Sequence, residues 1–210
     1  QSCVAGSRLY LHESIADEFL EKMVSLASSI KIGDPLLEET QMGPLATLGQ
    51  IELIESEISK AKEQGAEILH GGKKAKISND GWFYEPTIVE CKDQKIKIVD
   101  TELFGPVLSV LRFKSEAEVI ELANDTKYGL AAGIFTNSSA RSLRMTQALK
   151  AGIVWVNTYR VVSPIAPFGG YKDSGYGRES GMQAIYDYTR IKTVWINTSD
   201  EPMSNPFQMR

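Results

Sequence analysis

VLSVLRF at residues 107–113 opens the stretch of sequence that decides the fold. It is a short apolar run typical of a buried strand, and LAAGIFT at 130–136 and IVWVN at 153–157 are two more. The segments between them, 115–123 and 138–149, carry apolar residues at helical spacing. Strand–helix–strand–helix–strand order predicts right-handed crossovers and a parallel sheet with helices on both faces. We therefore expect an α/β fold of three layers, α/β/α, around a mainly parallel sheet.

The amino-terminal half carries further signals of the same kind. Residues 9–11 are predicted as a strand, and Ser14 as the N-cap of a helix whose apolar residues recur up to residue 30. A second helix is predicted at 48–64 and a strand at 66–69. These elements fit the same α/β class.

Composition excludes several classes of function. The chain has 210 residues, of which 42% are hydrophobic and 24% charged, and its formal net charge of −4 gives no reason to expect nucleic acid or an anionic membrane as a partner. No apolar run approaches the ~18 residues of a membrane span. Two cysteines are too few for a disulfide scaffold and predict a reducing, cytoplasmic location. The two histidines, His12 and His70, show no metal-ligand spacing, so no metal is expected.

The longest loop-like stretch is Thr158–Gly181, which follows the last predicted strand. Ligands of parallel sheets bind beyond the carboxyl ends of the strands, so we expect this loop to form a wall of a site. Its GYGRESG at 175–181 resembles a dinucleotide-binding fingerprint but fails, because the last glycine is one residue late and no strand precedes it. Near the start of the chain, Cys3 lies among small residues that leave a reactive thiol accessible.

Three neighbourhoods together resemble the aldehyde dehydrogenase superfamily: QSCVAGSR at 1–8, ELFGPV at 102–107, and PFGGYK at 167–172, which continues as DSGYGRE. The resemblance extends over essentially the whole chain. It implies a catalytic domain at 1–185 and a C-terminal strand and tail at 186–210. The family's nucleotide-binding domain and general base would precede the first residue, which is not Met. We therefore expect a fragment that is inactive as a dehydrogenase by itself.

The resemblance implies roles for four residues near the reaction. Cys3 matches the nucleophile, whose thiolate attacks an aldehyde carbonyl to form a thiohemiacetal and then a thioester. Glu179 matches an acid that relays protons or holds water, although it could equally pair with Arg178 or be an acid at the start of a helix. Glu102 matches the acid that accepts hydrogen bonds from the nicotinamide ribose, and Phe104 matches the aromatic beside that ribose. The implied cofactor is NAD or NADP.

Four more residues match the wall of the family's substrate tunnel: Arg160, Val161, Val162 and Phe168. Aliphatic side chains at 161 and 162, where many relatives carry aromatic ones, suggest a wide mouth. The cation of Arg160 would attract an aldehyde that carries a carboxylate, such as a semialdehyde, or it could be an ordinary surface charge. The implied substrate is a small aldehyde of unspecified structure.

The end of the chain is assigned to assembly. Ile191–Asn197 is predicted as a strand, and the resemblance implies that it extends the sheet of a neighbouring subunit in a homodimer or homotetramer. The polar tail at 199–210, with two prolines, shows no core pattern.

Two other functions stay open at the level of sequence. A cysteine hydrolase or acyltransferase would need His12 or His70 at hydrogen-bond distance from the Cys3 sulfur. A non-catalytic assembly module would keep the fold and the C-terminal strand without using the thiol.

Overall fold

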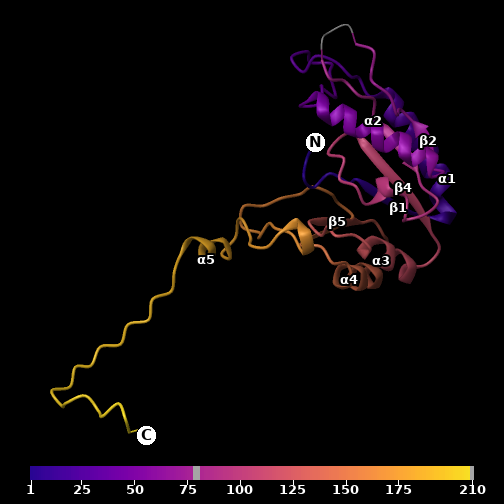
Figure 1. The fold of residues 1–210 in the computed structure, drawn as a ribbon. Coiled ribbons are helices and arrows are strands. Elements are labelled where there is room, and N and C mark those ends of the chain that lie inside the picture. Colours follow the sequence, from indigo (N-terminus) through magenta and orange to yellow (C-terminus); the bar gives the residue numbers. More distant parts are fainter. Residues whose placement is uncertain (78–80, 209–210) are drawn as a thin grey trace.

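The computed structural model describes residues 1–77 and 81–208 (Figure 1). Its elements follow in the order β1 (Arg8–His12), α1 (Glu13–Ser29), α2 (Leu48–Glu63), β2 (Glu67–His70), β3 (Thr87–Glu90), η1 (Lys97–Val99), β4 (Val107–Phe113), α3 (Glu116–Asn124), β5 (Ala131–Ile134), α4 (Ser139–Ala148), β6 (Ile153–Val156), η2 (Lys172–Ser174) and α5 (Ala184–Tyr188). Within the described ranges, no helix is both long enough and apolar enough to cross a bilayer.

The strands form a four-stranded sheet and a separate parallel pair. In the larger sheet the order is β1-β4-β3-β2, with β1, β4 and β3 mutually parallel and β2 antiparallel at the edge. The smaller sheet consists of β5 and β6. The predicted α/β class with mainly parallel strands is confirmed.

The expectation that the strands at 107–157 belong to one sheet is wrong. β4 has β1 on one edge and β3 on the other, so it has no free edge for β5. After α3 the chain forms β5, which pairs with β6 in a second sheet. The molecule therefore contains two separate sheets.

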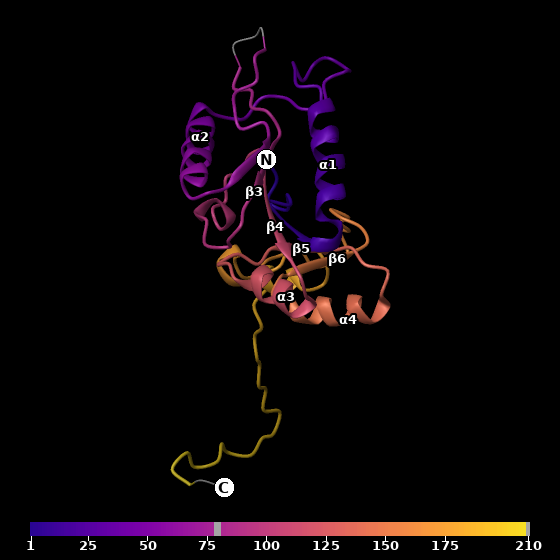
Figure 2. The ribbon, with the colours of Figure 1, turned by 90° about the vertical axis from the view of Figure 1, so that its right-hand side faces the viewer.

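Two helices cover opposite faces of the four-stranded sheet, as Figure 2 shows for α1 and α2. Ile88 and Val110 pack with residues of α1, whereas their chain neighbours Val89 and Leu111 pack with residues of α2. This alternation is the period of two that a strand imposes on its side chains. Each fully buried aliphatic side chain, such as Ile54 at 0% exposure, contributes about 1.5–3 kcal/mol of hydrophobic stabilisation.

The β5–β6 pair packs with α3 and α4 into a third apolar cluster. Tyr10 of β1 and Phe113 of β4 also contact this cluster, which connects the smaller sheet to the larger one. On the surface, Glu116 at the start of α3 accepts hydrogen bonds from Arg144 of α4 at 2.7 and 2.8 Å. The two helices are therefore joined by apolar contacts inside and by an ion pair outside.

Helix caps follow the sequence signals with one exception. Ser115 caps α3 and Ser138 caps α4 through their hydroxyls. Ser14 is not the N-cap of α1, because the helix begins at Glu13 and the His12 imidazole accepts the Ser14 N–H at 3.2 Å. The imidazole takes the place of the predicted hydroxyl.

The chain after α5 extends away from the body (Figure 1). The predicted strand at 191–197 is not formed in this structure, since none of these residues belongs to a described strand. A strand requires an edge with which to pair, and no strand within residues 1–77 and 81–208 pairs with this segment. Trp195 is 90% exposed as a result.

Candidate active site

Cys3 lies in a tight turn at the start of the chain. The Ala5 N–H donates to the Ser2 carbonyl at 3.0 Å, so Cys3 and Val4 are the two central residues of the turn. Val4 is buried, whereas Cys3 is a free and exposed cysteine. The buried Val4 side chain thus fixes the turn to the protein, and the Cys3 thiol is accessible to solvent.

Gln1, the residue before this turn, contacts the segment that leads into α2. The Ala46 N–H donates to the side-chain carbonyl of Gln1 at 3.1 Å, and the Gln50 amide donates to the backbone carbonyl of Leu103. Leu103 is the residue between Glu102 and Phe104. The segment before α2 therefore contacts Gln1, and the first turn of α2 contacts the backbone of the predicted cofactor-binding pair.

Sheet topology gives a second reason why these two segments share a face. Cys3 precedes β1 and Phe104 precedes β4, and these strands are parallel neighbours in the register Arg8↔Ser109. The Ser109 N–H continues the pairing toward the chain start by donating to Ser7 at 3.0 Å. Both segments therefore leave the same amino-terminal edge of the sheet.

Phe104 adopts an unusual backbone conformation with a φ of 50°. A non-glycine residue at positive φ costs about 1–3 kcal/mol, and such residues concentrate at functional sites. Its side chain is 42% exposed, and Glu102 is also exposed. The following Gly105 has no room for a side chain, because a Cβ there would lie 2.4 Å from the Ile54 side chain.

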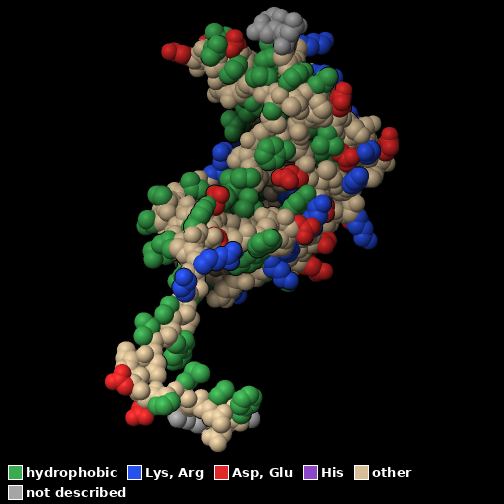
Figure 3. Space-filling view, turned by 60° about the vertical axis from the view of Figure 1, so that its left-hand side comes forward, with side chains coloured by type: hydrophobic (Ala, Val, Ile, Leu, Met, Phe, Trp, Pro, Cys, Tyr) green, Lys and Arg blue, Asp and Glu red, His purple; other side chains and the backbone are tan. Residues whose placement is uncertain are grey.

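The Cys3 turn also contacts Tyr159, which lies three residues after the end of β6. Tyr159 donates its hydroxyl hydrogen to the Val4 carbonyl at 2.8 Å. The amino edge of the larger sheet therefore meets the carboxyl end of the smaller one. The surface is hollowed where the two parts of the molecule meet, with hydrophobic side chains around the hollow and charged ones near its rim (Figure 3).

The glycine-rich loop brings two predicted residues together. Phe168 and Glu179 form an antiparallel bridge in which each backbone N–H donates to the other's carbonyl, at 2.7 and 2.8 Å. The alternative that Glu179 pairs with Arg178 is wrong for the described chain. The Arg178 guanidinium donates instead to the carbonyls of Gly170 and Gly177, at 3.0 and 2.6 Å.

The three remaining predicted wall residues are exposed. Arg160 has a φ of 62°, and the side chains of Val161 and Val162 are 61% and 65% exposed. The Val161 carbonyl accepts a hydrogen bond from the Trp155 indole at 2.7 Å, which fixes the backbone while leaving the side chain free. Among the residues that the structure describes, no hydrogen bond joins any of these three side chains to Cys3.

Sequence reasoning placed Tyr159 only in the loop wall and missed its contact with the Cys3 segment. The available signal was a tyrosine just after the last predicted strand. Nothing in the sequence indicates that its partner lies 155 residues away along the chain.

Neither histidine is placed to act on Cys3, which contradicts the cysteine-hydrolase alternative. His12 ends β1, so at about 3.3 Å per residue it lies more than 10 Å beyond the first residue of that strand. Its two ring nitrogens contact the Ser14 hydroxyl and the Lys114 carbonyl. His70 belongs to β2, three strands away from β1.

The second cysteine, Cys91, is buried and unreactive. Cys91 is 3% exposed, and burial, with a smaller effect of the Glu90 charge, raises the pKa of its thiol to about 11. At neutral pH it is a protonated, inaccessible thiol. A reagent for thiolates should therefore distinguish the two cysteines.

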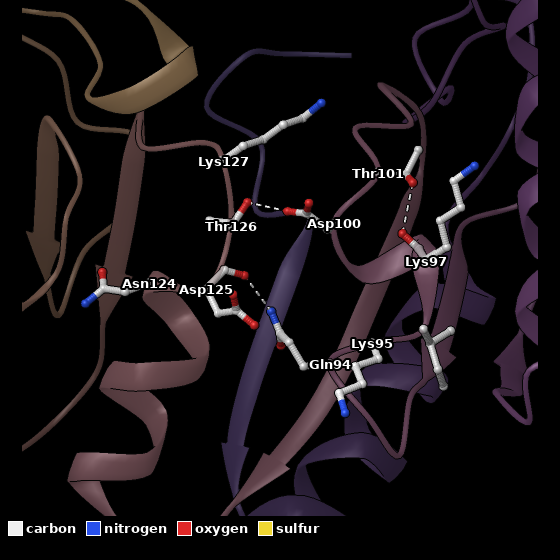
Figure 4. Close-up of a pocket in the computed structure, with 10 residues that line it drawn as sticks. Gln94, Lys95, Lys97, Asp100, Thr101, Asn124, Asp125, Thr126 and Lys127 are labelled. Carbon is white, nitrogen blue, oxygen red and sulfur yellow. Dashed lines mark hydrogen bonds between the residues drawn. The ribbon is translucent and has the colours of Figure 1, made fainter.

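A separate polar hollow lies between the η1 region and the end of α3 (Figure 4). Its volume is about 570 Å³, and it is lined by residues 94–97, 100–101 and 124–127. On its lining, the Thr126 hydroxyl donates a hydrogen bond to the Asp100 carboxylate at 2.5 Å. It includes none of the predicted site residues.

The chain was compared with known proteins. Residues 1–194 match the model of the aldehyde dehydrogenase family. A (Z)-2-((N-methylformamido)methylene)-5-hydroxybutyrolactone dehydrogenase of Acinetobacter baylyi is 52% identical, with 100% of this chain and 43% of the relative covered. A betaine aldehyde dehydrogenase of Brucella anthropi is 45% identical, with 93% and 41% covered. The NAD+ complex of an aldehyde dehydrogenase from Bacillus cereus is 41% identical with a TM-score of 0.91, and 95% and 40% are covered. The chain thus spans 40% to 43% of the length of these relatives.

Proposed function

Because the chain belongs to the aldehyde dehydrogenase family, we propose that it takes part in the oxidation of a small aldehyde to a carboxylic acid, with NAD or NADP as the hydride acceptor. Cys3 is the nucleophile. The observation that carries the proposal is an exposed thiol in a turn that Tyr159 holds through Val4, next to Gln1, whose side chain accepts a hydrogen bond from Ala46 just before α2. A nucleophile needs both access and a fixed position, and this turn supplies both.

The reaction begins at the sulfur of Cys3. Its thiolate attacks the carbonyl carbon, so that a carbon–sulfur bond forms and the carbonyl oxygen becomes an oxyanion. The backbone N–H of Cys3 donates to this oxyanion. The nicotinamide cofactor, when bound, supplies the acceptor for the hydride that leaves the same carbon. Water then displaces the sulfur from the thioester, releasing the acid and the thiol, and Glu179 relays a proton of this water to solvent.

The residues at 102–104 fit a nicotinamide nucleotide by their chemistry. Glu102 is an exposed carboxylate that can accept hydrogen bonds from ribose hydroxyls, each contributing about 1.5–3 kcal/mol. Phe104 offers a ring that is 42% exposed at the same edge of the sheet. We assign this pair to cofactor binding.

An aldehyde should protect Cys3 from alkylation in the 210-residue chain. Iodoacetamide is expected to label Cys3 and leave Cys91 unlabelled. Aldehyde at ten times its dissociation constant should slow the labelling about tenfold, because the thiohemiacetal removes the free thiol by mass action. Peptide mass spectrometry separates the two sites.

The matched control is the alcohol of the same chain length, which cannot form a thiohemiacetal and should not protect. Rapid Cys3 labelling at every concentration of a panel of aldehydes would contradict the proposed function. That result would favour the assembly-module alternative.

Arg160 supports a substrate that carries a carboxylate at the end remote from the aldehyde. Arg160→Gln should raise the KM for a semialdehyde about 1.4- to fivefold in the polypeptide that carries this sequence, since an exposed ion pair contributes about 0.2–1 kcal/mol. The KM for an uncharged aldehyde of equal length should stay the same. Phe168, Val161 and Val162 complete this wall in the proposal. If the substitution changed the KM values for both aldehydes equally, Arg160 would be an ordinary surface charge with no role in recognising the carboxylate.

The tail supplies a proposal about assembly. Residues 1–185 form the catalytic body, and 186–210 contact another subunit of a homodimer or homotetramer. Trp195 and Ile196 are 90% and 79% exposed in an extended segment, which is the state expected of a strand that pairs between subunits. We also place the protein in the cytoplasm, because its nucleophile is a free thiol.

A further inference from the structure

The Val4–Ala5 peptide group next to Cys3 is held at both of its polar atoms. Its N–H donates to the Ser2 carbonyl at 3.0 Å and closes the turn. Its carbonyl oxygen accepts the Tyr159 hydroxyl at 2.8 Å. A peptide group is planar, so two opposite hydrogen bonds restrict its rotation about the chain direction. The orientation of the turn that carries Cys3 therefore depends on Tyr159.

Tyr159 is itself held firmly. Its ring packs edge-to-face on Trp155, with ring centroids 5.0 Å apart and planes at 68°. The Trp155 indole is in turn tied to the Val161 carbonyl at 2.7 Å. The Tyr159 ring is therefore held at its hydroxyl by the Val4 carbonyl and on its side by Trp155, which is itself fixed to the backbone.

Two glycines make room for this ring. A Cβ at Gly133 of β5 would lie 2.8 Å from the Tyr159 ring, and one at Gly6 would lie 3.3 Å from its hydroxyl oxygen. Neither glycine has a positive φ, so their lack of a side chain serves close approach and not backbone conformation. The smaller sheet, at Gly133, and the Cys3 segment, at Gly6, therefore both pack closely against Tyr159.

The hydroxyl is a permanent donor at this place. Burial raises the pKa of Tyr159 above its usual value, against a smaller opposite effect of Arg160. It stays protonated in the neutral range and so keeps its hydrogen bond to Val4.

We propose that Tyr159 is the positioning residue of the nucleophile: its hydroxyl holds the Cys3 turn so that the Cys3 backbone N–H is directed at the oxyanion of the thiohemiacetal. This inference rests on the proposed function. Attack on an aldehyde creates an oxyanion that requires this N–H. Alkylation by iodoacetamide displaces iodide and creates no oxyanion. The two reactions of the same sulfur should therefore depend differently on Tyr159.

Tyr159→Phe keeps the ring and removes only the hydroxyl. In the 210-residue chain we expect the aldehyde concentration that half-protects Cys3 to rise about three- to tenfold, the range for loss of one neutral hydrogen bond. The rate of iodoacetamide labelling without aldehyde should change less than twofold. In the polypeptide that carries this sequence, kcat should fall by a similar factor while KM changes little.

Gly133→Ala provides a second variant that keeps the hydroxyl but displaces the ring, and it should weaken protection in the same way. Tyr10→Phe is the matched control, because the Tyr10 hydroxyl also contacts a backbone carbonyl, that of Leu122 at 3.1 Å, but not the Cys3 segment. It should lower the thermal midpoint without changing protection. Circular dichroism checks that each variant is folded.

The exchange rate of the Ala5 amide hydrogen, measured by NMR, tests the positioning without any aldehyde. Tyr159→Phe should raise it at least about threefold, because the Val4–Ala5 peptide loses one of its two restraints. Unchanged exchange, or protection equal to that of the unmodified chain, would overturn the inference. Absence of protection in the unmodified chain would instead refute the proposed function, and the Ala5 exchange would still decide the role of Tyr159.

Discussion

Cys3→Ala is expected to abolish aldehyde oxidation in the polypeptide that carries this sequence, with kcat falling by about 10³-fold or more. Without the sulfur no carbon–sulfur bond forms, so the aldehyde carbon is no longer attached to the protein in the position from which its hydride leaves. The measurement is the absorbance of reduced nicotinamide at saturating aldehyde.

Cys91→Ala is the matched control for this prediction. Cys91 is buried in the core, so the variant should lose about 1 kcal/mol of stability to a small cavity and keep its kcat. A Cys3→Ala protein that retained even a tenth of the activity would remove Cys3 from the mechanism. Equal loss of activity in both variants would point to a folding defect.

Gly152→Ala should produce a large structural effect. A Cβ at this position would lie 1.9 Å from the Gly169 carbonyl oxygen and 3.2 Å from the Gly170 Cα. Both neighbours are backbone atoms, so the glycine-rich loop must move away from the beginning of β6. We expect a loss of about 1–3 kcal/mol or more in the free energy of unfolding. Displacement of Phe168, the neighbour of Gly169, should lower activity as well.

The measurement is urea unfolding followed by circular dichroism, with Gly49→Ala as the control. Gly49 lies in α2, and a Cβ there meets nothing within 4 Å. Alanine should stabilise that helix by about 0.5–1 kcal/mol. A Gly152→Ala protein as stable as the parent would show that the loop adapts at no cost and that the close approach is not required.

Local sequence patterns identified most elements of the second half. The strands and helices from β4 to β6 lie within two residues of the predicted ranges, because each strand carries its own apolar pattern and each helix its own periodicity and N-cap, such as Ser115. β3 at Thr87–Glu90 was missed. It has four residues after a proline, which is too short for a period to emerge, yet it lies inside the sheet between β2 and β4.

The candidate site was predictable only in pieces. Motif resemblance selected Cys3, Glu102 and Phe168 without regard to distance. The exposed thiol and the Phe168–Glu179 bridge are consistent with that selection. Tyr159 could not be assigned a role in this way, because a hydroxyl that binds a remote backbone carbonyl leaves no pattern in the chain.

The sequence by itself determined the alternation of strands and helices, the family resemblance and the chemistry available at Cys3, since these depend on short-range spacing and on residue type. Only the tertiary structure decided that β4 has both edges filled, that the smaller sheet closes on the Cys3 turn through Tyr159, and that Gly133 and Gly152 must be small. Those outcomes depend on which edges and surfaces meet. Contacts between residues far apart in the chain arise from the packing of whole elements and are not encoded in any single segment.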